Sequence, residues 1–272
     1  MNRTKWRVVE EACHLGEERE RWASAQARGA VGAVTSWGAG MPGREMIRLY
    51  WEFDGGPVPE GEDLVEENWT SHWRESFRTT QVSRQLCLVP AWEAVSPDEA
   101  RCNLRIDPGM AFGAGDHPTT RLCLRLLEDL SAAGKLPTRF LDVGCGTGVL
   151  ALAAGCLGVA RCDALDIDPF GYAACRRNAE LNDLQHKIRP LLLSLDLLND
   201  RYPLVAANIV VGQLETLALL LRERVEPGGR LLLSGFEATH EERVVRALGW
   251  PVGERLEEEH WVALILRAPK EG

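Results

Sequence analysis

From about residue 85 onward, short apolar runs alternate with longer segments whose apolar residues recur at helical spacing. The short runs predict strands over 86–89, 139–143, 162–166, 188–193, 203–207, 229–234 and 260–267. The longer segments predict helices between them, including 119–130, 149–157, 170–181, 213–224 and 237–248. Strands that alternate with helices in this way predict a mostly parallel sheet covered by helices on both faces.

The first part of the chain has a different pattern. Strand-like pieces over 6–10, 31–36 and 45–53, with a charged helical segment over 17–28, are consistent with a small α/β unit. The run Gly55-Gly56-Pro57-Val58-Pro59 breaks regular structure and marks a boundary. We therefore expect a small N-terminal domain over 1–58, a linker over 59–84 and an α/β domain over 85–272.

The linker is expected to be helical. Over residues 62–79 five apolar positions recur at helical intervals among charged residues, namely Leu64, Val65, Trp69, Trp73 and Phe77. This spacing predicts an amphipathic helix whose aromatic stripe packs against a neighbouring surface.

Composition narrows the possible partners and the compartment. The 272 residues carry a formal net charge of -9, which argues against non-specific nucleic-acid binding and is compatible with a basic protein substrate. The eight cysteines include no C-x-x-C pair and no histidines at zinc spacing. We expect no metal site, buried free thiols such as Cys123, Cys156 and Cys175, and a reducing, cytoplasmic location. No apolar run is long enough to cross a bilayer, so no membrane contact is expected.

The most informative segment is Phe140-Leu141-Asp142-Val143-Gly144-Cys145-Gly146-Thr147-Gly148, where an apolar strand ends in three glycines before an apolar helix. Glycines allow positive φ and close approach of a ligand, and the helix N-terminus offers unpaired N–H groups. A dinucleotide site favours G-x-G-x-x-G, whereas here the third glycine comes one position earlier. The spacing favours S-adenosylmethionine over a dinucleotide.

Two further strand ends carry polar residues that this cofactor could use. Asp166 ends the next predicted strand, about twenty residues beyond the turn, where a carboxylate can bind ribose hydroxyls. Asp168 follows it, and Pro169 suits the first turn of a helix; solvated loop acids are the alternative for both carboxylates. Asn208 ends the apolar strand 203–207, and an amide in such surroundings needs hydrogen-bond partners. An asparagine that bonds its own loop is the alternative there.

A glycine-rich loop precedes this core, with the sequence DPGMAFGAGDHPTT over 107–120, and we expect Thr119 or Thr120 to cap the following helix. The loop, LDVGCGTGVLALAA over 141–154, ALDIDP over 164–169 and VAANI over 205–209 together resemble the bacterial PrmA family, the methyltransferases of large-subunit ribosomal protein L11. The similarity extends to EENWTSHWRESF (66–77), LVPAWE (88–93) and EEEHWVALIL (257–266), and is weakest over 1–58.

The resemblance implies a class I S-adenosylmethionine-dependent methyltransferase: a Rossmann-like, mostly parallel seven-stranded sheet with a small N-terminal α+β ferredoxin-like domain that recognises the ribosomal protein. Its cofactor contacts correspond here to Thr120, Gly144, Asp166 and Asn208. The motifs add Asp142, Gly146 and Phe112 as candidates. The loop departs from the family pattern at Ala114 and Asp116, where the family has FGTG followed by Thr or His.

The implied reaction is transfer of a methyl group to lysine side-chain or N-terminal amines. We hypothesise that Asn208 is the catalytic residue, whose side-chain oxygen orients the amine, and that His117 has a structural or loop-closing role rather than that of a base. The alternatives are a methyltransferase of another protein's amines and a non-catalytic cofactor-binding scaffold. A nucleic-acid enzyme is disfavoured because Ile209, Val210 and Val211 follow Asn208, and a nicotinamide oxidoreductase because of the glycine spacing. We expect a monomer.

Overall fold

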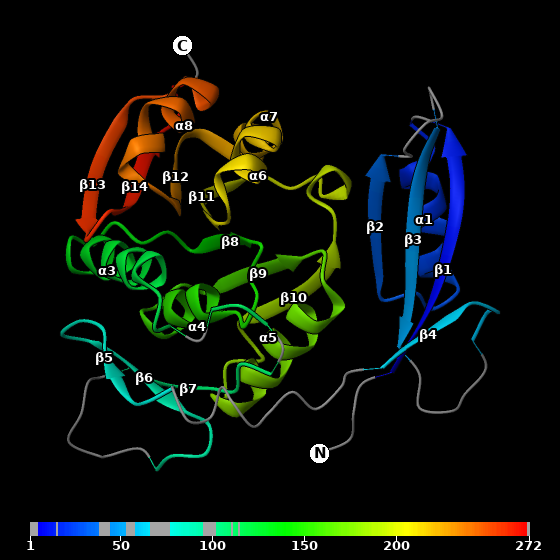
Figure 1. The fold of residues 1–272 in the computed structure, drawn as a ribbon, viewed down its shortest axis with the longest axis horizontal. Helices are drawn as coiled ribbons and strands as arrows, with labels where there is room; N and C mark the ends of the chain where they lie inside the picture. The colour runs from blue at the N-terminus through cyan, green and yellow to red at the C-terminus, as the bar shows by residue number, and fades with distance from the viewer. Residues whose placement is uncertain are drawn as a thin grey trace.

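The computed structural model describes residues 5–14, 16–37, 44–52, 58–65, 77–94, 102–109, 111–113 and 115–270. Its C-terminal part is a seven-stranded array (Figure 1), made of β8 (Arg139–Val143), β9 (Arg161–Asp166), β10 (Ile188–Leu193), β11 (Tyr202–Asn208), β12 (Val225–Glu237), β13 (Val252–Glu258) and β14 (Trp261–Arg267). The order is β13-β14-β12-β11-β8-β9-β10, and β14 is antiparallel to both of its neighbours. The predicted mostly parallel sheet is confirmed.

Helices cover both faces of this array. On one side lie α3 (Pro118–Ala132), α4 (Val149–Cys156) and α5 (Pro169–Leu181), and on the other lie α6 (Val211–Thr216), α7 (Ala218–Arg224) and α8 (Glu241–Leu248). Alternate residues of a strand serve the two cores: Leu204 and Ala206 face the first, Val205 and Ala207 the second. The helix predicted over 213–224 is two helices, and that over 237–248 starts only at Glu241, after the 3-10 turn η2 (Ala238–His240). A further 3-10 turn is η1 (Leu195–Leu197).

The strand predicted over 86–89 does not belong to this sheet. It is β6 (Leu86–Pro90), and it forms a separate sheet with β5 (Thr80–Gln81) and β7 (Cys102–Ile106). The seventh strand of the main sheet is instead β13, which was not predicted because most of its residues are charged and none is fully buried. An edge strand of this kind lacks the apolar run from which strands were predicted.

The N-terminal part contains the elements expected before residue 54: β1 (Lys5–His14), α1 (Glu18–Ala27), β2 (Gly32–Trp37) and β3 (Arg44–Glu52). The predicted helix over 62–79 is wrong at its start, where β4 (Glu62–Val65) pairs antiparallel with β1. Pairing with a distant strand here overrides the local helical spacing. Residues 66–76, with Trp69 and Trp73, lie outside the described residues, and 77–79 are not helical.

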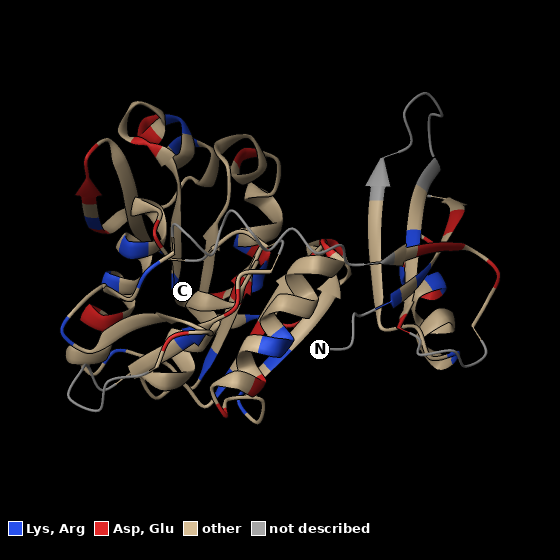
Figure 2. Cartoon of the chain, turned by 60° about the horizontal axis from the view of Figure 1, so that its bottom comes forward, with Lys and Arg blue, Asp and Glu red and all other residues tan. Residues whose placement is uncertain are grey.

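The strands of the N-terminal part lie in the order β2-β3-β1-β4 and are antiparallel at each step. Within the described residues this sheet continues the main one, because β2 pairs in parallel with β10. Ser194 donates its backbone N–H to the carbonyl of Ala33 at 3.1 Å, and its hydroxyl accepts from the N–H of Thr35 at 2.7 Å. Arg176 on α5 forms two 2.6 Å hydrogen bonds with Glu52 on β3. Figure 2 shows the two parts side by side from a second direction.

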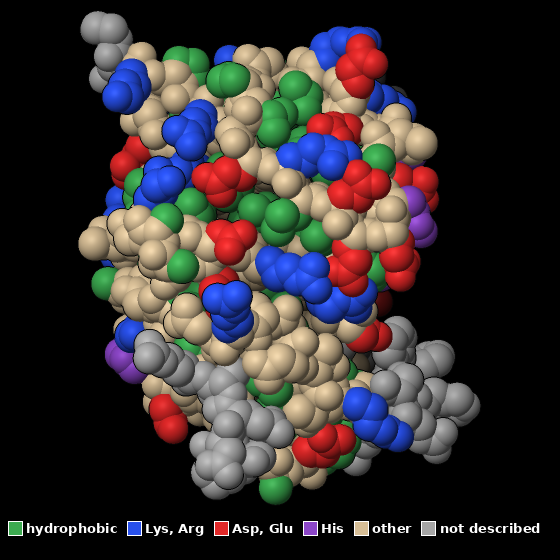
Figure 3. Space-filling model, turned by 90° about the vertical axis from the view of Figure 1, so that its left-hand side faces the viewer, with side chains coloured by type: hydrophobic (Ala, Val, Ile, Leu, Met, Phe, Trp, Pro, Cys, Tyr) green, Lys and Arg blue, Asp and Glu red, His purple; other side chains and the backbone are tan. Residues whose placement is uncertain are grey.

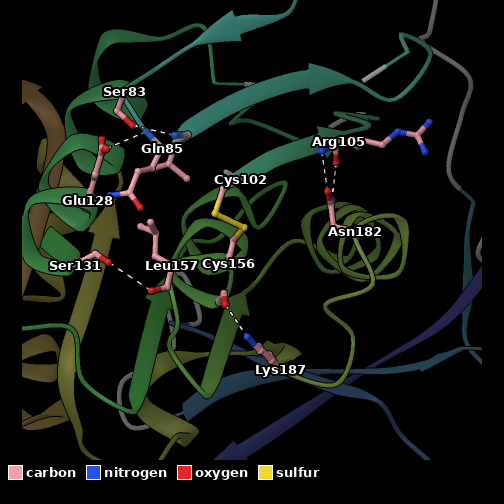
Figure 4. Close-up of a disulfide and its surroundings, with 12 residues drawn as sticks. Ser83, Gln85, Cys102, Arg105, Glu128, Ser131, Cys156, Leu157, Asn182 and Lys187 are labelled. Atoms are coloured by element: carbon pink, nitrogen blue, oxygen red, sulfur yellow. Dashed lines mark hydrogen bonds between the residues drawn. A yellow bond between two sulfur atoms is a disulfide. The ribbon is translucent and has the colours of Figure 1, made fainter. Parts of the chain in front are cut away.

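Cys102 on β7 and Cys156 at the end of α4 form a disulfide, drawn in Figure 4. The expectation that Cys156 is a free thiol is therefore wrong. The two cysteines are 54 positions apart, and only the packing of the small sheet on α4 brings their Cα atoms to 6.0 Å, within the range that a disulfide spans. Cys123 and Cys175 are buried thiols, as expected. No helix among the described residues is long and apolar enough to cross a membrane.

Candidate active site

The glycine turn between β8 and α4 has the tight shape that its sequence predicts. Gly144, Gly146 and Gly148 have φ values of +69°, +51° and +80°, which side-chain-bearing residues rarely adopt. A Cβ would also collide at each: at Gly144 with the Ile209 side chain (2.5 Å), at Gly146 with the Phe112 carbonyl oxygen (2.2 Å) and at Gly148 with the Cys175 sulfur. The turn is therefore closely packed by the loop before α3, by the end of β11 and by α5.

Asp166 lies beside this turn, at the carboxyl end of β9. One carboxylate oxygen accepts the N–H of Gly146 at 2.7 Å, and the other accepts the N–H of Asp168 at 2.9 Å. Burial raises the pKa of Asp166. The next side chain, Ile167, is 51% exposed. Asp168 accepts the N–H of Phe170 at 2.9 Å and so caps α5, a structural role for the second acid.

Asp142 lies beneath the turn rather than at its surface. Its side chain is only 1% exposed, and one oxygen accepts the N–H of Ala151, in the first turn of α4, at 3.2 Å. Burial raises the pKa of Asp142 to about 7, and the nearby Asp166 acts in the same direction. The geometry gives this carboxyl a role in joining β8 to α4.

The glycine-rich loop crosses the turn. Thr147 donates its N–H to the carbonyl of Phe112 at 3.0 Å and its hydroxyl to the carbonyl of Gly113 at 2.6 Å. The Phe112 side chain remains 61% exposed. Ala114, one of the two departures from the family pattern, lies outside the described residues.

His117, rather than Thr119 or Thr120, caps α3. Its Nδ1 lies 2.7 Å from the Thr119 hydroxyl and 3.4 Å from the Thr119 backbone nitrogen, and Pro118 begins the helix. The ring centroid of His117 lies 5.8 Å from that of Phe112 and 4.8 Å from that of Trp261. Burial lowers the pKa of His117, which favours a neutral imidazole. These three rings form an aromatic group at the N-terminus of α3.

Asn208 and Thr120, both candidates from the sequence, are brought together from distant parts of the chain. The Asn208 amide donates to the Thr120 hydroxyl at 3.4 Å, and Thr120 is fully buried. The Asn208 side-chain oxygen is buried and has no hydrogen-bond partner within the described structure. Because Ala207 pairs with Val143, Asn208 lies level with the start of the glycine turn. An unused buried acceptor therefore lies at the edge of the turn, where a ligand could supply a donor.

Several residues at this site were not singled out from the sequence. They include Ile167, Thr147, Trp261 and the buried Asn178 on α5. Thr147 and Ile167 adjoin residues that the motifs marked, so position alone could have suggested them. Trp261 and Asn178 come from elements far along the chain, and only the fold shows that they are close.

The strand order, the glycine turn and the carboxylate that ends β9 define a class I S-adenosylmethionine-dependent methyltransferase. The family model described as ribosomal protein L11 methyltransferase (PrmA) matches residues 51–269. The chain belongs to this family, as its motifs predicted.

Individual relatives agree with this assignment. The ribosomal protein L11 methyltransferase of Symbiobacterium thermophilum is 42% identical over 211 residues, 76% of this chain and 67% of that protein. That of a Geobacter species is 40% identical over 210 residues, 76% of this chain and 69% of that protein. Among solved structures, a ribosomal protein L11 methylase from Lactobacillus delbrueckii subsp. bulgaricus is 29% identical with a TM-score of 0.63, covering 72% of this chain and 100% of its own.

Proposed function

We propose that this chain transfers methyl groups from S-adenosylmethionine to lysine side-chain or N-terminal amines of ribosomal protein L11. The names of its relatives support the substrate. The observation that carries the proposal is the buried, unpartnered oxygen of Asn208 beside Thr120 and the glycine turn. An acceptor in this position suits an amine, which has N–H groups to donate.

The residues of the turn fit the cofactor. Each Asp166 oxygen accepts one backbone N–H, so lone pairs remain for ribose hydroxyls, and the exposed side chain of Ile167 offers an apolar surface to the adenine ring. Gly144 and Gly146 leave the backbone open to close approach. When bound, S-adenosylmethionine supplies an electrophilic methyl group on a sulfonium; the remaining work, to orient a neutral amine, falls to the protein.

The pKa of the acceptor amine determines how much help the amine needs from the site. An α-amine has a pKa of about 7.7–8.0, so part of it is neutral near pH 7, whereas lysine at about 10.4 must lose a proton at a cost of roughly 4 kcal/mol. We assign Asn208 the role of accepting a hydrogen bond from the amine, which aims the nitrogen lone pair at the methyl carbon. Alignment of this kind can lower a barrier by about 7–11 kcal/mol in favourable cases.

We propose that the aromatic group of Phe112, His117 and Trp261 contacts the lysine side chain as its amine approaches the methyl group. The ring centroids of Phe112 and Trp261 lie 5.8 Å and 4.8 Å from that of His117, so the three rings pack together at the start of α3. Packed rings suit the alkyl chain of lysine and exclude water from the reacting amine. Because the pKa of His117 is lowered, its imidazole stays neutral and adds no second positive charge beside the substrate amine.

Substitution of Asn208 tests this proposal. Asn208→Ala should abolish turnover and leave the affinity for S-adenosylhomocysteine within about threefold, because the side-chain oxygen of Asn208 is assigned to the amine. Asn103→Ala is the matched control: Asn103 also has a buried oxygen without a partner among the described residues, but lies on β7. Unchanged turnover in Asn208→Ala, measured with labelled cofactor, would refute the assigned role.

We further propose a cytoplasmic monomer that contacts protein rather than nucleic acid. The net charge of -9 supports contact with protein rather than with nucleic acid. The face in Figure 3, on which basic and acidic side chains are interleaved, supports the same conclusion. The proposed substrate, a ribosomal protein, supports the cytoplasmic location. Methylation of another protein's amines is the alternative; it would show as turnover with a cell extract and none with purified L11.

A further inference from the structure

We propose that Asn178 is a positioning residue that holds the covering loop against the glycine turn in the shape that binds S-adenosylmethionine. The covering loop is defined here as the described residues 107–109 and 111–113. The inference rests on the cofactor site described above, and concerns a side chain that is assigned no contact with cofactor or amine.

The first observation is the set of bonds that Asn178 makes. The side chain is fully buried, and its oxygen accepts the N–H of Asp107 at 2.8 Å. Its amide nitrogen donates to the carbonyl of Asp107 at 3.1 Å and to that of Thr147 at 3.0 Å. A single amide therefore uses both its donors and its acceptor to join α5, the covering loop and the glycine turn.

Asn182, the C-cap residue of α5 four positions beyond Asn178, makes a comparable bridge to Arg105. Its oxygen accepts the N–H of Arg105 and its amide donates to the Arg105 carbonyl, both at 2.7 Å (Figure 4). The two side chains thus bind alternate residues of one extended segment, as a neighbouring strand would. Only Asn178 also reaches the glycine turn, since the remaining donor bond of Asn182 goes to the Asn178 carbonyl at 2.7 Å.

The other end of the covering loop is fixed by Thr147. Its N–H and hydroxyl bind the carbonyls of Phe112 and Gly113, at 3.0 Å and 2.6 Å. The carbonyl of the same Thr147 is the one that Asn178 binds. The loop is thus anchored at Asp107 and at Phe112, and both anchors converge on one buried threonine.

Through these contacts Asn178 holds the covering loop and the glycine turn in position. Without its amide, the Asp107 N–H and the carbonyls of Asp107 and Thr147 would lose a buried partner, and such groups must find water or move. Either change shifts the backbone that Gly146 packs against, and with it the Phe112 side chain at the mouth of the site.

The test compares Asn178→Ala with Asn182→Ala, a control that removes the two bonds to Arg105 on β7 and the bond to the Asn178 carbonyl, but no bond to the glycine turn. Asn178→Ala should weaken S-adenosylhomocysteine binding by at least tenfold in calorimetry and raise KM for S-adenosylmethionine by a similar factor. Asn182→Ala should change both by less than threefold. Hydrogen exchange of the covering loop should accelerate in the first variant only.

A second pair keeps the proposal testable if Asn178→Ala does not fold. Thr147→Val loses the hydroxyl bond to Gly113 at nearly constant volume and should weaken S-adenosylhomocysteine binding by about tenfold. Thr147→Ser keeps the hydroxyl and should retain the binding of the unaltered protein. Equal effects of Asn178→Ala and Asn182→Ala, or unchanged binding in Asn178→Ala and Thr147→Val, would overturn the inference. Failure of the unaltered protein to bind S-adenosylhomocysteine would instead overturn the proposed function, and the inference with it.

Discussion

Replacement of Asp142 by asparagine should remove a pH-dependent penalty on the folded state. Asp142 is 1% exposed, and its bond from the Ala151 N–H needs only an oxygen, which asparagine also has. Because burial raises the pKa of Asp142 to about 7, the folded protein holds a proton that the unfolded chain releases near its ordinary value of 3.8. The stability contributed by the protonated carboxyl is therefore complete below about pH 4 and is lost as the pH rises through 7.

The size of the effect follows from the difference between the pKa of Asp142 in the folded protein, about 7, and its ordinary value of 3.8. Each pH unit between the two pKa values corresponds to about 1.4 kcal/mol, so ionisation of Asp142 should cost the folded state about 4 kcal/mol by pH 8. The difference in unfolding free energy between Asp142→Asn and the unaltered protein should grow from pH 4 to 7 and then level off.

Urea unfolding at five pH values between 4.5 and 8.5 measures this difference. Asp163→Asn is a control of opposite sign, because Asp163 is equally buried but forms two 2.8 Å bonds with Arg189; its loss should destabilise the protein at neutral pH. Parallel stability curves for Asp142→Asn and the unaltered protein would refute the reasoning, since they would show that Asp142 has the same pKa in the folded and unfolded states.

Three further predictions concern other parts of the chain. Replacing Cys102 and Cys156 together by serine should lower the unfolding free energy by about 4 kcal/mol, the closure entropy of a loop of 54 residues; equal urea midpoints would contradict this. Gly32→Leu should separate β2 from β10, because a Cβ at Gly32 would lie 2.4 Å from Leu192 Cγ; an unchanged radius of gyration in X-ray scattering would argue against it. His117→Ala should reduce turnover equally at pH 7 and pH 9; recovery at pH 9 would identify His117 as a base.

The sequence predicted most of the main sheet and the residues that converge on its edge. A buried strand such as β11 is predicted by its continuous apolar run, and the turn glycines are predicted by their spacing. Since carboxyl ends of parallel strands meet at one edge, the order of the motifs along the chain was enough to place Asp166 and Asn208 near the turn. Whether these residues contact the cofactor stays a prediction.

What the sequence did not predict depends on contacts between distant segments. Strand β4 forms where β1 offers a partner, and β13 is held by β14 although few of its residues are apolar. The Cys102–Cys156 disulfide and the three bonds of Asn178 likewise join segments more than fifty and thirty positions apart. Local periodicity carries no information on such pairs.

The most direct test of the proposed function is incubation of the protein with labelled S-adenosylmethionine and purified ribosomal protein L11, followed by intact-mass analysis and peptide mapping. We predict mass gains in steps of one methyl group, located on lysine side chains or the N-terminus of L11, and no gain with Asn208→Ala. Binding of the cofactor without any gain on L11 would contradict it.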